Sequence, residues 1–397
     1  MKEPSAPRAA GGLRVVPVLD QSALVAVSEE WSALLARSAS NRPTQAPFWL
    51  LAWWRVFGGS LGRHLATALL FDGSRLVGVA PLQRHLRWHR GLIPFRSLNL
   101  LATGEPSEDE VLSDYLGVIA ERGYEEAVAE SLAVAIARGT LGPVDELVLS
   151  MLDGALSIND ALATSFRSQG YTVERQELSP SPYIRLPATW NEYLSALSGS
   201  GRYLVTRSLR DFERWAGGES DLARVTTMAE LEEGKRILIS QHGERWRSSG
   251  QSGVFASRAF TGFHDAVLPR LLEAGALELT WLRVRGEPVA VSYSIVWDNK
   301  VLFYQGGRTM DVPKGVRPGI ALHARNIQAA IEAGRSEYDF LPGDSQYKLQ
   351  LATDAHAVLR LRASRAPLRD AACVLVERGV VAVRAARARA KAGSHPQ

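Results

Sequence analysis

Two stretches of the sequence repeat one order of secondary structure, and this repeat limits the folds that the chain can adopt. In each stretch, two runs rich in β-branched and aromatic residues flank a tight glycine turn, at Asp72-Gly73 and at Gly286. Such runs around a glycine turn predict a β-hairpin. A helical pattern and then a short apolar strand follow each hairpin, at 121–139 and 146–152, and again at 318–334 and 337–341. We therefore predict an α+β fold of two copies of one unit, each a mixed, mainly antiparallel sheet flanked by helices.

The chain is long enough for two such domains. It has 397 residues, of which 46 % are hydrophobic and 22 % are charged, as is typical of a globular protein with a buried core. We predict a disordered N-terminus at 1–12, an N-terminal domain at 13–180, a C-terminal domain with the functional site at 181–362, and a basic helix and tail at 363–397.

Several classes of protein are not indicated. Cys373 is the single cysteine, so an internal disulfide is excluded, which agrees with a reducing compartment. The first residues contain no apolar signal segment, and no run approaches the roughly 20 apolar residues of a membrane span. The eight histidines form no metal-ligand pattern, and no phosphate-binding glycine motif occurs. We expect a cytoplasmic protein with no metal and no permanently bound cofactor.

The net charge of +4 lies largely in the last thirty residues. One interpretation is a helix that contacts an anionic surface such as a membrane. The other, which the base rate for charged helices favours, is a solvated helix followed by a frayed tail.

A strand, "VLFYQGG", leads into a loop and then a helix that begins near Pro318-Gly319. Proline suits the first turn of a helix, and the N–H groups of a helix start bind anions, often a pyrophosphate. Lys314 and Arg317, just upstream, could pair with phosphate. The alternative is an ordinary loop between a strand and a helix.

The stretch "YDFLPGDSQYK" brings several chemical groups to the end of the next strand. Acyl transfer to an amine needs a base, a donor to the oxyanion and an acid for the leaving group. An aspartate or a water chain could be the base, Tyr347 the acid, and Lys348 or a backbone N–H the oxyanion donor. The alternative is structural: Asp344 caps a helix that starts at Ser345, and Lys348 pairs with Asp339.

Seven short motifs occur in order along residues 45–360: "PFWLLAWW", "RLVGVAPL", "LSDYLGVI", "PVAVSYSI", "VLFYQGG", "PGIALHARNIQAAIEAG" and "YDFLPGDSQYK". In this order they resemble the CelD/BcsL-type acetyltransferase family of the GCN5-related N-acetyltransferase (GNAT) superfamily, which is related to the Fem aminoacyltransferases. The resemblance implies tandem GNAT-like domains. It also implies acyl transfer from acyl-CoA as co-substrate, or from aminoacyl-tRNA in the Fem branch, and a link to exopolysaccharide biosynthesis.

The resemblance also implies roles for individual residues. The donor phosphate would lie at Gly315, Arg317, Gly319 and Ile320, and the acyl channel at Tyr304 and Gln305. The transfer centre would be flanked by Asp344, Tyr347 and Lys348, and the acceptor would be bound by His242, Arg245, Trp246 and Asp339. The pyrophosphate loop of the superfamily usually has two glycines, whereas residues 317–321 contain one.

Three functions follow from these observations. The first is an acyltransferase that uses acyl-CoA and acts on an amine or hydroxyl of a small molecule or a surface-polysaccharide precursor. The second is a Fem-like aminoacyltransferase that uses charged tRNA, for which a stripe of four arginines in 200–217 is the support; no other nucleic acid is expected. The third is a non-catalytic GNAT scaffold in exopolysaccharide synthesis, suggested by the shortened loop.

Overall fold

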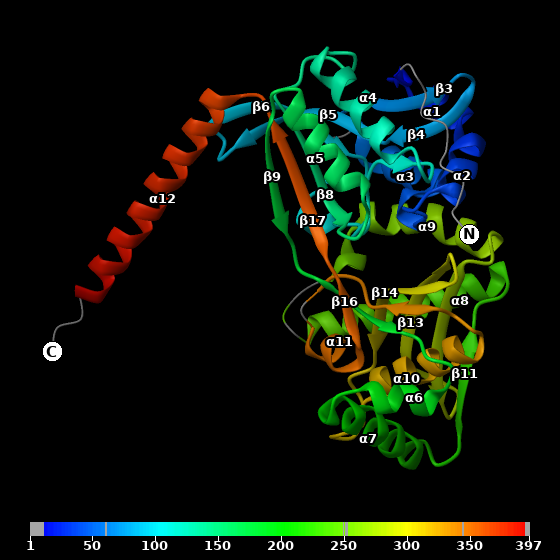
Figure 1. The fold of residues 1–397 in the computed structure, drawn as a ribbon. Helices are drawn as coiled ribbons and strands as arrows, with labels where there is room; N and C mark the ends of the chain where they lie inside the picture. The colour runs from blue at the N-terminus through cyan, green and yellow to red at the C-terminus, as the bar shows by residue number, and fades with distance from the viewer. Residues whose placement is uncertain (1–11, 60–61, 249, 251–252, 344, 394–397) are drawn as a thin grey trace.

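The computed structural model describes residues 12–59, 62–248, 250, 253–343 and 345–393, and it describes side chains as far as residue 380. Nearly all of the N-terminus that we predict to be disordered lies outside these residues. The described chain has an α+β fold in two halves, each with sheets flanked by helices (Figure 1).

The N-terminal half contains two sheets. The four-stranded sheet has the order β1 (Arg14–Val18), β3 (Thr67–Asp72), β4 (Arg75–Ala80), β7 (Ile119–Ala120). The six-stranded sheet has the order β2 (His64–Leu65), β5 (Leu82–His89), β6 (Ile93–Leu100), β8 (Glu146–Asp153), β17 (Val358–Ser364), β9 (Thr172–Glu177). The helices of this half are α1 (Gln21–Ala26), α2 (Ser28–Arg37), α3 (Pro47–Trp53), α4 (Glu125–Ala137) and α5 (Ile158–Ser168), with short turns η1 (Pro43–Gln45), η2 (Trp54–Gly58) and η3 (Ser107–Asp109).

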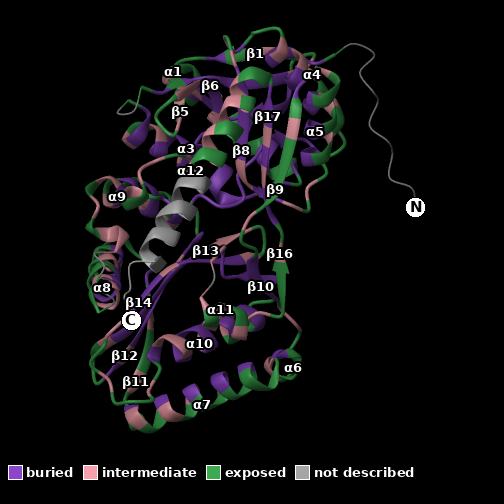
Figure 2. Ribbon diagram, turned by 90° about the vertical axis from the view of Figure 1, so that its left-hand side faces the viewer, coloured by how far each residue is buried: buried purple, intermediate pink, exposed green. Residues whose placement is uncertain are grey.

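The C-terminal half is built on one seven-stranded sheet. Its order is β11 (Ser220–Arg224), β12 (Leu277–Val284), β13 (Glu287–Trp297), β14 (Lys300–Arg308), β15 (Glu337–Asp339), β10 (Ser181–Arg185), β16 (Asp354–His356). The helices of this half are α6 (Trp190–Ala196), α7 (Gly199–Ala216), α8 (Met228–Arg247), α9 (Arg258–Glu273), α10 (Pro318–Glu332) and α11 (Gln346–Leu351), with the short turn η4 (Val254–Ala256). The last helix, α12 (Pro367–Gly393), follows β17 and starts beside the six-stranded sheet of the N-terminal half. Figure 2 shows that central strands such as β8 and β13 are largely buried, whereas the outer strands β9 and β16 are largely exposed.

Both predicted hairpins are confirmed. β3 pairs with β4 around Asp72-Gly73, and β12 pairs with β13 around Arg285-Gly286. The glycines have φ angles of 60° and 82°, which a residue without Cβ adopts at little cost. The predicted helix and strand after each hairpin are also present, as α4 and β8 and as α10 and β15.

The two halves exchange strands near their boundary. β10 follows the N-terminal half and enters the C-terminal sheet, where it pairs with β15 and β16. β17 returns from the C-terminal half and pairs with β8 and β9 in the N-terminal sheet. Residues 358–362, which the predicted C-terminal domain includes, therefore lie in the sheet of the other half. The predicted domain boundaries stay a prediction.

The C-terminal sheet opens at one place. β14 and β15 pair in parallel only where Lys300–Leu302 lie beside Glu337–Asp339, and β14 then continues to Arg308 without β15 beside it. The pairing of β13 with β14 shifts between Tyr293 and Ser294, which leaves Tyr304 as an extra residue. Two strands that diverge leave room for a ligand between them.

The end of β14 also lies unusually close to α8. A Cβ atom on Gly307 would lie 2.5 Å from the backbone nitrogen of His242, so only glycine fits there. This contact fixes the end of α8, and with it Arg245, beside the open end of β14.

Helix α12 extends away from the rest of the protein, as Figure 1 shows. Among the described residues, none of the helices combines the length and the apolar character that a membrane span requires.

Candidate functional site

A cavity of about 340 Å³ lies where β14 and β15 diverge. Its walls come from β13, the end of β14, the start of α10, α8 and α11. The residues that line it are Arg245, Val291, Ser292, Phe303, Gly306, Gly307, Arg308, Val316, Arg317, Gly319, Ile320, Leu322, His323 and Tyr347. Five of the residues predicted for the site therefore meet in one cavity, namely Arg245, Arg317, Gly319, Ile320 and Tyr347.

Three arginines give this cavity a positive wall. Arg245 comes from the last turn of α8, Arg308 from the end of β14, and Arg317 from the residue before α10. Burial, together with the charge of Arg245, lowers the pKa of Arg308. Pro318 starts α10, and no side chain caps this end of the helix. Guanidinium groups beside an uncapped helix start form an arrangement that binds an anion such as phosphate.

His323 and Tyr347 form a second, uncharged side of the cavity. Their ring centroids lie 5.4 Å apart, and His323 Nδ1 lies 3.2 Å from the hydroxyl of Tyr338. Burial lowers the pKa of His323 to about 3, and the positive charges of Lys348 and Arg245 add to this effect. Burial raises the pKa of Tyr347. At neutral pH the cavity therefore holds a neutral imidazole and a protonated phenol.

Lys348 holds the loop between β15 and α11. Its Nζ donates to the carbonyl oxygens of Leu341 and Pro342, at 3.1 Å and 3.2 Å. Gly343 in this loop has φ 141°, and Leu341 has φ 59°. The third residue predicted for the transfer centre, Asp344, lies outside the described residues.

Asp114 is a buried carboxyl group of the N-terminal half, and its pKa responds to the charge of Lys348. Asp114 is 5 % exposed, and burial raises its pKa to about 8. The negative charge of Asp339 raises this pKa further, whereas Lys348 lowers it. Thr44 donates to the backbone carbonyl of Asp114 at 2.6 Å, so residues of the N-terminal half hold the segment in place. A carboxyl with a pKa of about 8 is mostly protonated at neutral pH, and only its ionised fraction, which grows as the pH rises, can accept a proton.

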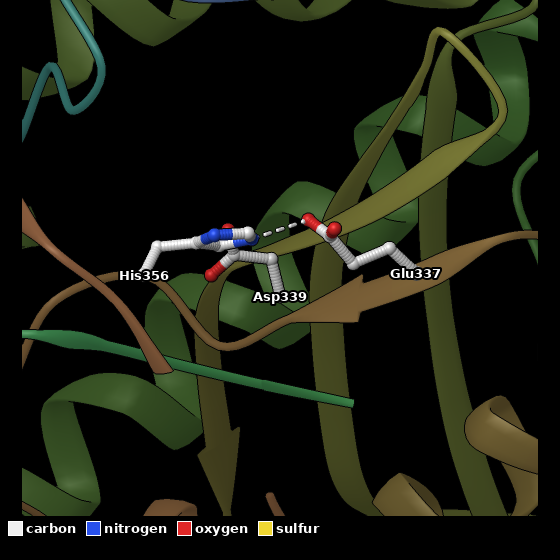
Figure 3. A group of neighbouring side chains, drawn as sticks. All are labelled: Glu337, Asp339 and His356. Carbon is white, nitrogen blue, oxygen red and sulfur yellow. Dashed lines mark hydrogen bonds and ion pairs between the residues drawn. The ribbon is translucent and has the colours of Figure 1, made fainter. Parts of the chain in front are cut away.

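Asp339 belongs to a buried polar network, which Figure 3 shows with Glu337 and His356. One ligand atom from each of the three lies within 4.8 Å of the others, a spacing that suits a metal ion. The carboxylates, however, already have partners. Asp339 accepts from Tyr115 at 2.6 Å and Ser181 at 2.7 Å, and Glu337 pairs with His356 and Lys300. We therefore interpret the group as a structural network.

The remaining predicted site residues lie elsewhere. Asp339 is fully buried and lies outside the cavity. Tyr304 is buried, and its hydroxyl donates to the carbonyl of Val111 in the N-terminal half. Gly315, with φ 97°, is exposed and does not line the cavity.

The predicted acceptor group on α8 is partly internal. His242 is 1 % exposed, and its Nε2 accepts a 2.9 Å hydrogen bond from Trp246 Nε1. Burial and the charge of Arg245 lower the pKa of His242 to about 4, and a hydrogen bond with Gln305 opposes this shift. His242, Gln305 and Trp246 thus support the wall that carries Arg245.

The arginine stripe on α7 is engaged locally. Arg207 and Arg214 each pair with Asp211 at 3.1 Å. Arg202 donates to the carbonyl of Leu194 near the end of α6 at 2.8 Å. These contacts hold the arginine side chains against α6 and α7, and the carboxylate of Asp211 offsets part of their charge.

Two titratable residues of the cavity lining, Arg308 and His323, were not predicted, and neither was a role for Asp114, which lies outside this lining. His323 lies four residues after Gly319 on α10, so helical spacing could have placed it on the face of the anion site. Arg308 ends the "VLFYQGG" strand, and its position depends on where β15 stops. Nothing in the local sequence shows that charged groups of the C-terminal half influence the pKa of Asp114.

Comparison with known proteins agrees with this geometry. Residues 199–349 match the model of the family described as "Acetyltransferase (GNAT) domain", and this range contains the whole cavity. No curated protein matches the chain.

Among solved structures, FemX has a TM-score of 0.58 at 11 % identity, over 86 % of this chain and 97 % of FemX. The C-terminal domain (DUF2156) of a putative lysylphosphatidylglycerol synthetase from Agrobacterium fabrum has a TM-score of 0.51 at 12 % identity, over 90 % and 97 %. A conserved protein of unknown function from Bacteroides thetaiotaomicron has a TM-score of 0.50 at 11 % identity, over 88 % and 100 %. At these identities the likeness shows the fold alone. Residues 199–349 thus match a GNAT-type acetyltransferase domain, and the α+β fold of the chain is similar to that of FemX.

Proposed function

We propose that the protein is an acyltransferase that moves an acyl group from acyl-CoA to an amine or hydroxyl of a small molecule or a surface-polysaccharide precursor. The observation that carries this proposal is the cavity between β14 and β15. It combines three arginines and an uncapped helix start with a protonated phenol and a neutral imidazole.

The donor would bind along β14 with its phosphates at the start of α10. Arg308 and Arg317 would pair with the phosphate oxygens, as guanidinium groups do with two parallel hydrogen bonds. The apolar side chains of Val291 and Phe303 would contact the uncharged part of the donor. Aspartate and glutamate are absent from the described lining of the cavity, so no carboxylate there would repel the negative charge of the donor phosphates.

The reaction needs two proton transfers. The acceptor nitrogen or oxygen attacks the thioester carbonyl carbon, the carbon–sulfur bond breaks, and CoA leaves as a thiolate that takes up a proton. Tyr347 lines the cavity in its protonated form and would supply that proton. Asp114, with its pKa of about 8, would accept the proton that the acceptor loses. Lys348 would keep the loop beside Tyr347 in place.

A second candidate is a Fem-like aminoacyltransferase that uses charged tRNA. The similarity to 97 % of the FemX chain supports this reading. The three arginines of the cavity would then bind phosphates near the aminoacylated end of the RNA. Because Arg207 and Arg214 on α7 pair with Asp211, the arginine stripe is weaker support for this candidate.

Isothermal titration calorimetry with acetyl-CoA, a long-chain acyl-CoA and free CoA tests the donor directly. We expect binding of CoA species that is lost in Arg317→Ala and kept in Arg210→Ala, a matched variant on α7. Charged tRNA is tested in parallel by gel mobility at low and high salt. Binding of tRNA that falls steeply with salt, without binding of CoA, would favour the Fem-like candidate. Binding of neither would favour a non-catalytic scaffold.

A further inference from the structure

Two acidic residues in the first half of helix α12, Asp370 and Glu377, join it to the rest of the protein. The carboxylate of Glu377 accepts two hydrogen bonds from Arg90, each of 2.9 Å, and lies 3.2 Å from His89 Nε2. Both partners belong to the end of the β5–β6 hairpin. Asp370, in the first turn of the helix, accepts hydrogen bonds from Arg362 and Ser364 of β17. The helix has 27 residues, about 40 Å at 1.5 Å per residue, and its later part extends away from the body (Figure 1).

The described part of α12 has an apolar face that is turned away from the protein. The face toward the body lines a cavity with Cys373, Val374 and Glu377. Leu368 and Leu375 are 87 % and 67 % exposed, and they lie seven residues apart, so they share one face of the helix. Two large apolar side chains that are exposed on one face indicate a surface without its partner.

The β5–β6 hairpin carries a second group of exposed apolar side chains. Leu86 and Trp88 are each 53 % exposed and, as alternate residues of one strand, project to the same side. Leu92, in the turn, is 67 % exposed. The ion pair between Arg90 and Glu377 joins this hairpin to α12, so the two groups lie at one end of the molecule. Leu86 and Trp88 lie on the face of β5 opposite Arg87 and His89, which line the cavity with α12, so they are not part of the same surface as the α12 leucines. We call Leu92, Leu368 and Leu375 together the arm surface.

The charge of α12 indicates what covers the arm surface. From Arg378 to the end of the chain the sequence contains five arginines or lysines and no aspartate or glutamate. The five are Arg378, Arg384, Arg387, Arg389 and Lys391. A second copy of the helix would bring like charges together, whereas an anionic lipid surface brings opposite charges.

We propose that the arm surface docks the protein on a membrane that contains anionic phospholipid. A basic helix with one apolar face lies in the membrane interface, held by apolar burial and by attraction to anionic headgroups. Docking through this end places the transferase domain at the membrane surface without a spanning segment.

Flotation of the full chain with lipid vesicles tests this proposal. We expect binding to vesicles that contain phosphatidylglycerol and little binding to vesicles of phosphatidylcholine alone. Raising the salt from about 50 mM to about 500 mM should weaken the binding, because screening shortens the reach of the basic residues. The double variant Leu368→Ser/Leu375→Ser should bind about tenfold more weakly, because it removes apolar area that enters the interface. Both side chains are exposed, so circular dichroism should show an unchanged fold.

Tyr203→Ser is the matched control, since Tyr203 is 57 % exposed on α7 in the other half of the protein. It should bind like the native chain. The proposal is overturned if phosphatidylglycerol vesicles are not bound at low salt, or if the double variant binds them as well as the native chain. It is also overturned if the double variant instead loses a dimer that the native chain forms in solution, because the surface would then be an interface between two copies.

Discussion

Tyr115 of the N-terminal half donates a 2.6 Å hydrogen bond to Asp339 of the C-terminal half. Both side chains are buried, with 1 % and 0 % of their surface exposed. Asp339 ends β15, the strand whose divergence from β14 opens the cavity. The GNAT-type domain is therefore held in shape by a residue that lies outside the matched range of 199–349.

Removing this hydroxyl should destabilise both halves together. Tyr115→Phe leaves a buried carboxylate with one donor fewer, which costs about 1–3 kcal/mol. We expect the free energy of unfolding, measured with urea, to fall by that amount, and unfolding to remain one cooperative transition. Tyr124→Phe is the control, because the hydroxyl of Tyr124 bonds to Asp72 within the N-terminal half at a more exposed site. An equal loss in both variants would contradict a special role for the contact between the halves.

The arginines of the cavity should control donor affinity. Arg317→Ala and Arg308→Ala each remove a charged partner of the donor phosphate. The KM of the donor should therefore rise about tenfold to a hundredfold. The KM of the acceptor should change little. Steady-state kinetics with each substrate varied in turn measures both, and Arg210→Ala should match the native enzyme. A change confined to the acceptor would place the phosphate elsewhere.

Tyr347→Phe should lower kcat and leave donor binding intact. The ring stays and only the proton donor is lost, so we expect a fall in kcat of about a hundredfold to ten-thousandfold. Calorimetry should show the same donor affinity as in the native protein. Unchanged turnover would remove Tyr347 from the proton transfer.

Much of the fold was predictable because it depends on local patterns. The glycine turns at Gly73 and Gly286, the start of α10 at Pro318 and the order of elements all follow from nearby residues. The influence of Asp339 and Lys348 on the pKa of Asp114 was not predictable, because it depends on how the two halves pack. The place of Arg308 likewise depends on β15 stopping at Asp339 while β14 continues. The buried state of Tyr304 follows from Val111, which is distant in the sequence.

Asp114 should make both stability and activity depend on pH. Its folded pKa, about 8, lies above the ordinary value of 3.8, so the folded state holds its proton more tightly than the unfolded state. Its contribution to stability is therefore complete below about pH 4 and is lost as the pH rises to about 8. Asp114→Asn should unfold at higher urea concentration than the native protein at pH 8. The same variant should flatten the rise of kcat with pH, and an unaltered profile would exclude Asp114 as the base.

The buried histidines should weaken the fold in acid. His264 has both ring nitrogens without a hydrogen-bond partner in the described part of the chain, and burial lowers its pKa to about 3. Because this pKa lies below the ordinary 6.5, the stability that the neutral ring contributes is present above pH 6.5 and is lost as the pH falls toward 3. His264→Phe should reduce the slope of unfolding free energy between pH 4 and 6 by about 1.4 kcal/mol per pH unit. An identical slope would show that His264 does not remain neutral.

The central claim is that the opening between β14 and β15 binds the activated donor, and hydrogen–deuterium exchange with and without acetyl-CoA tests it most directly. We expect slower exchange in residues 303–308 and 317–323, with no such change in α7. Acetyl-CoA that binds and protects only segments away from this cavity, or that protects none, would contradict the claim.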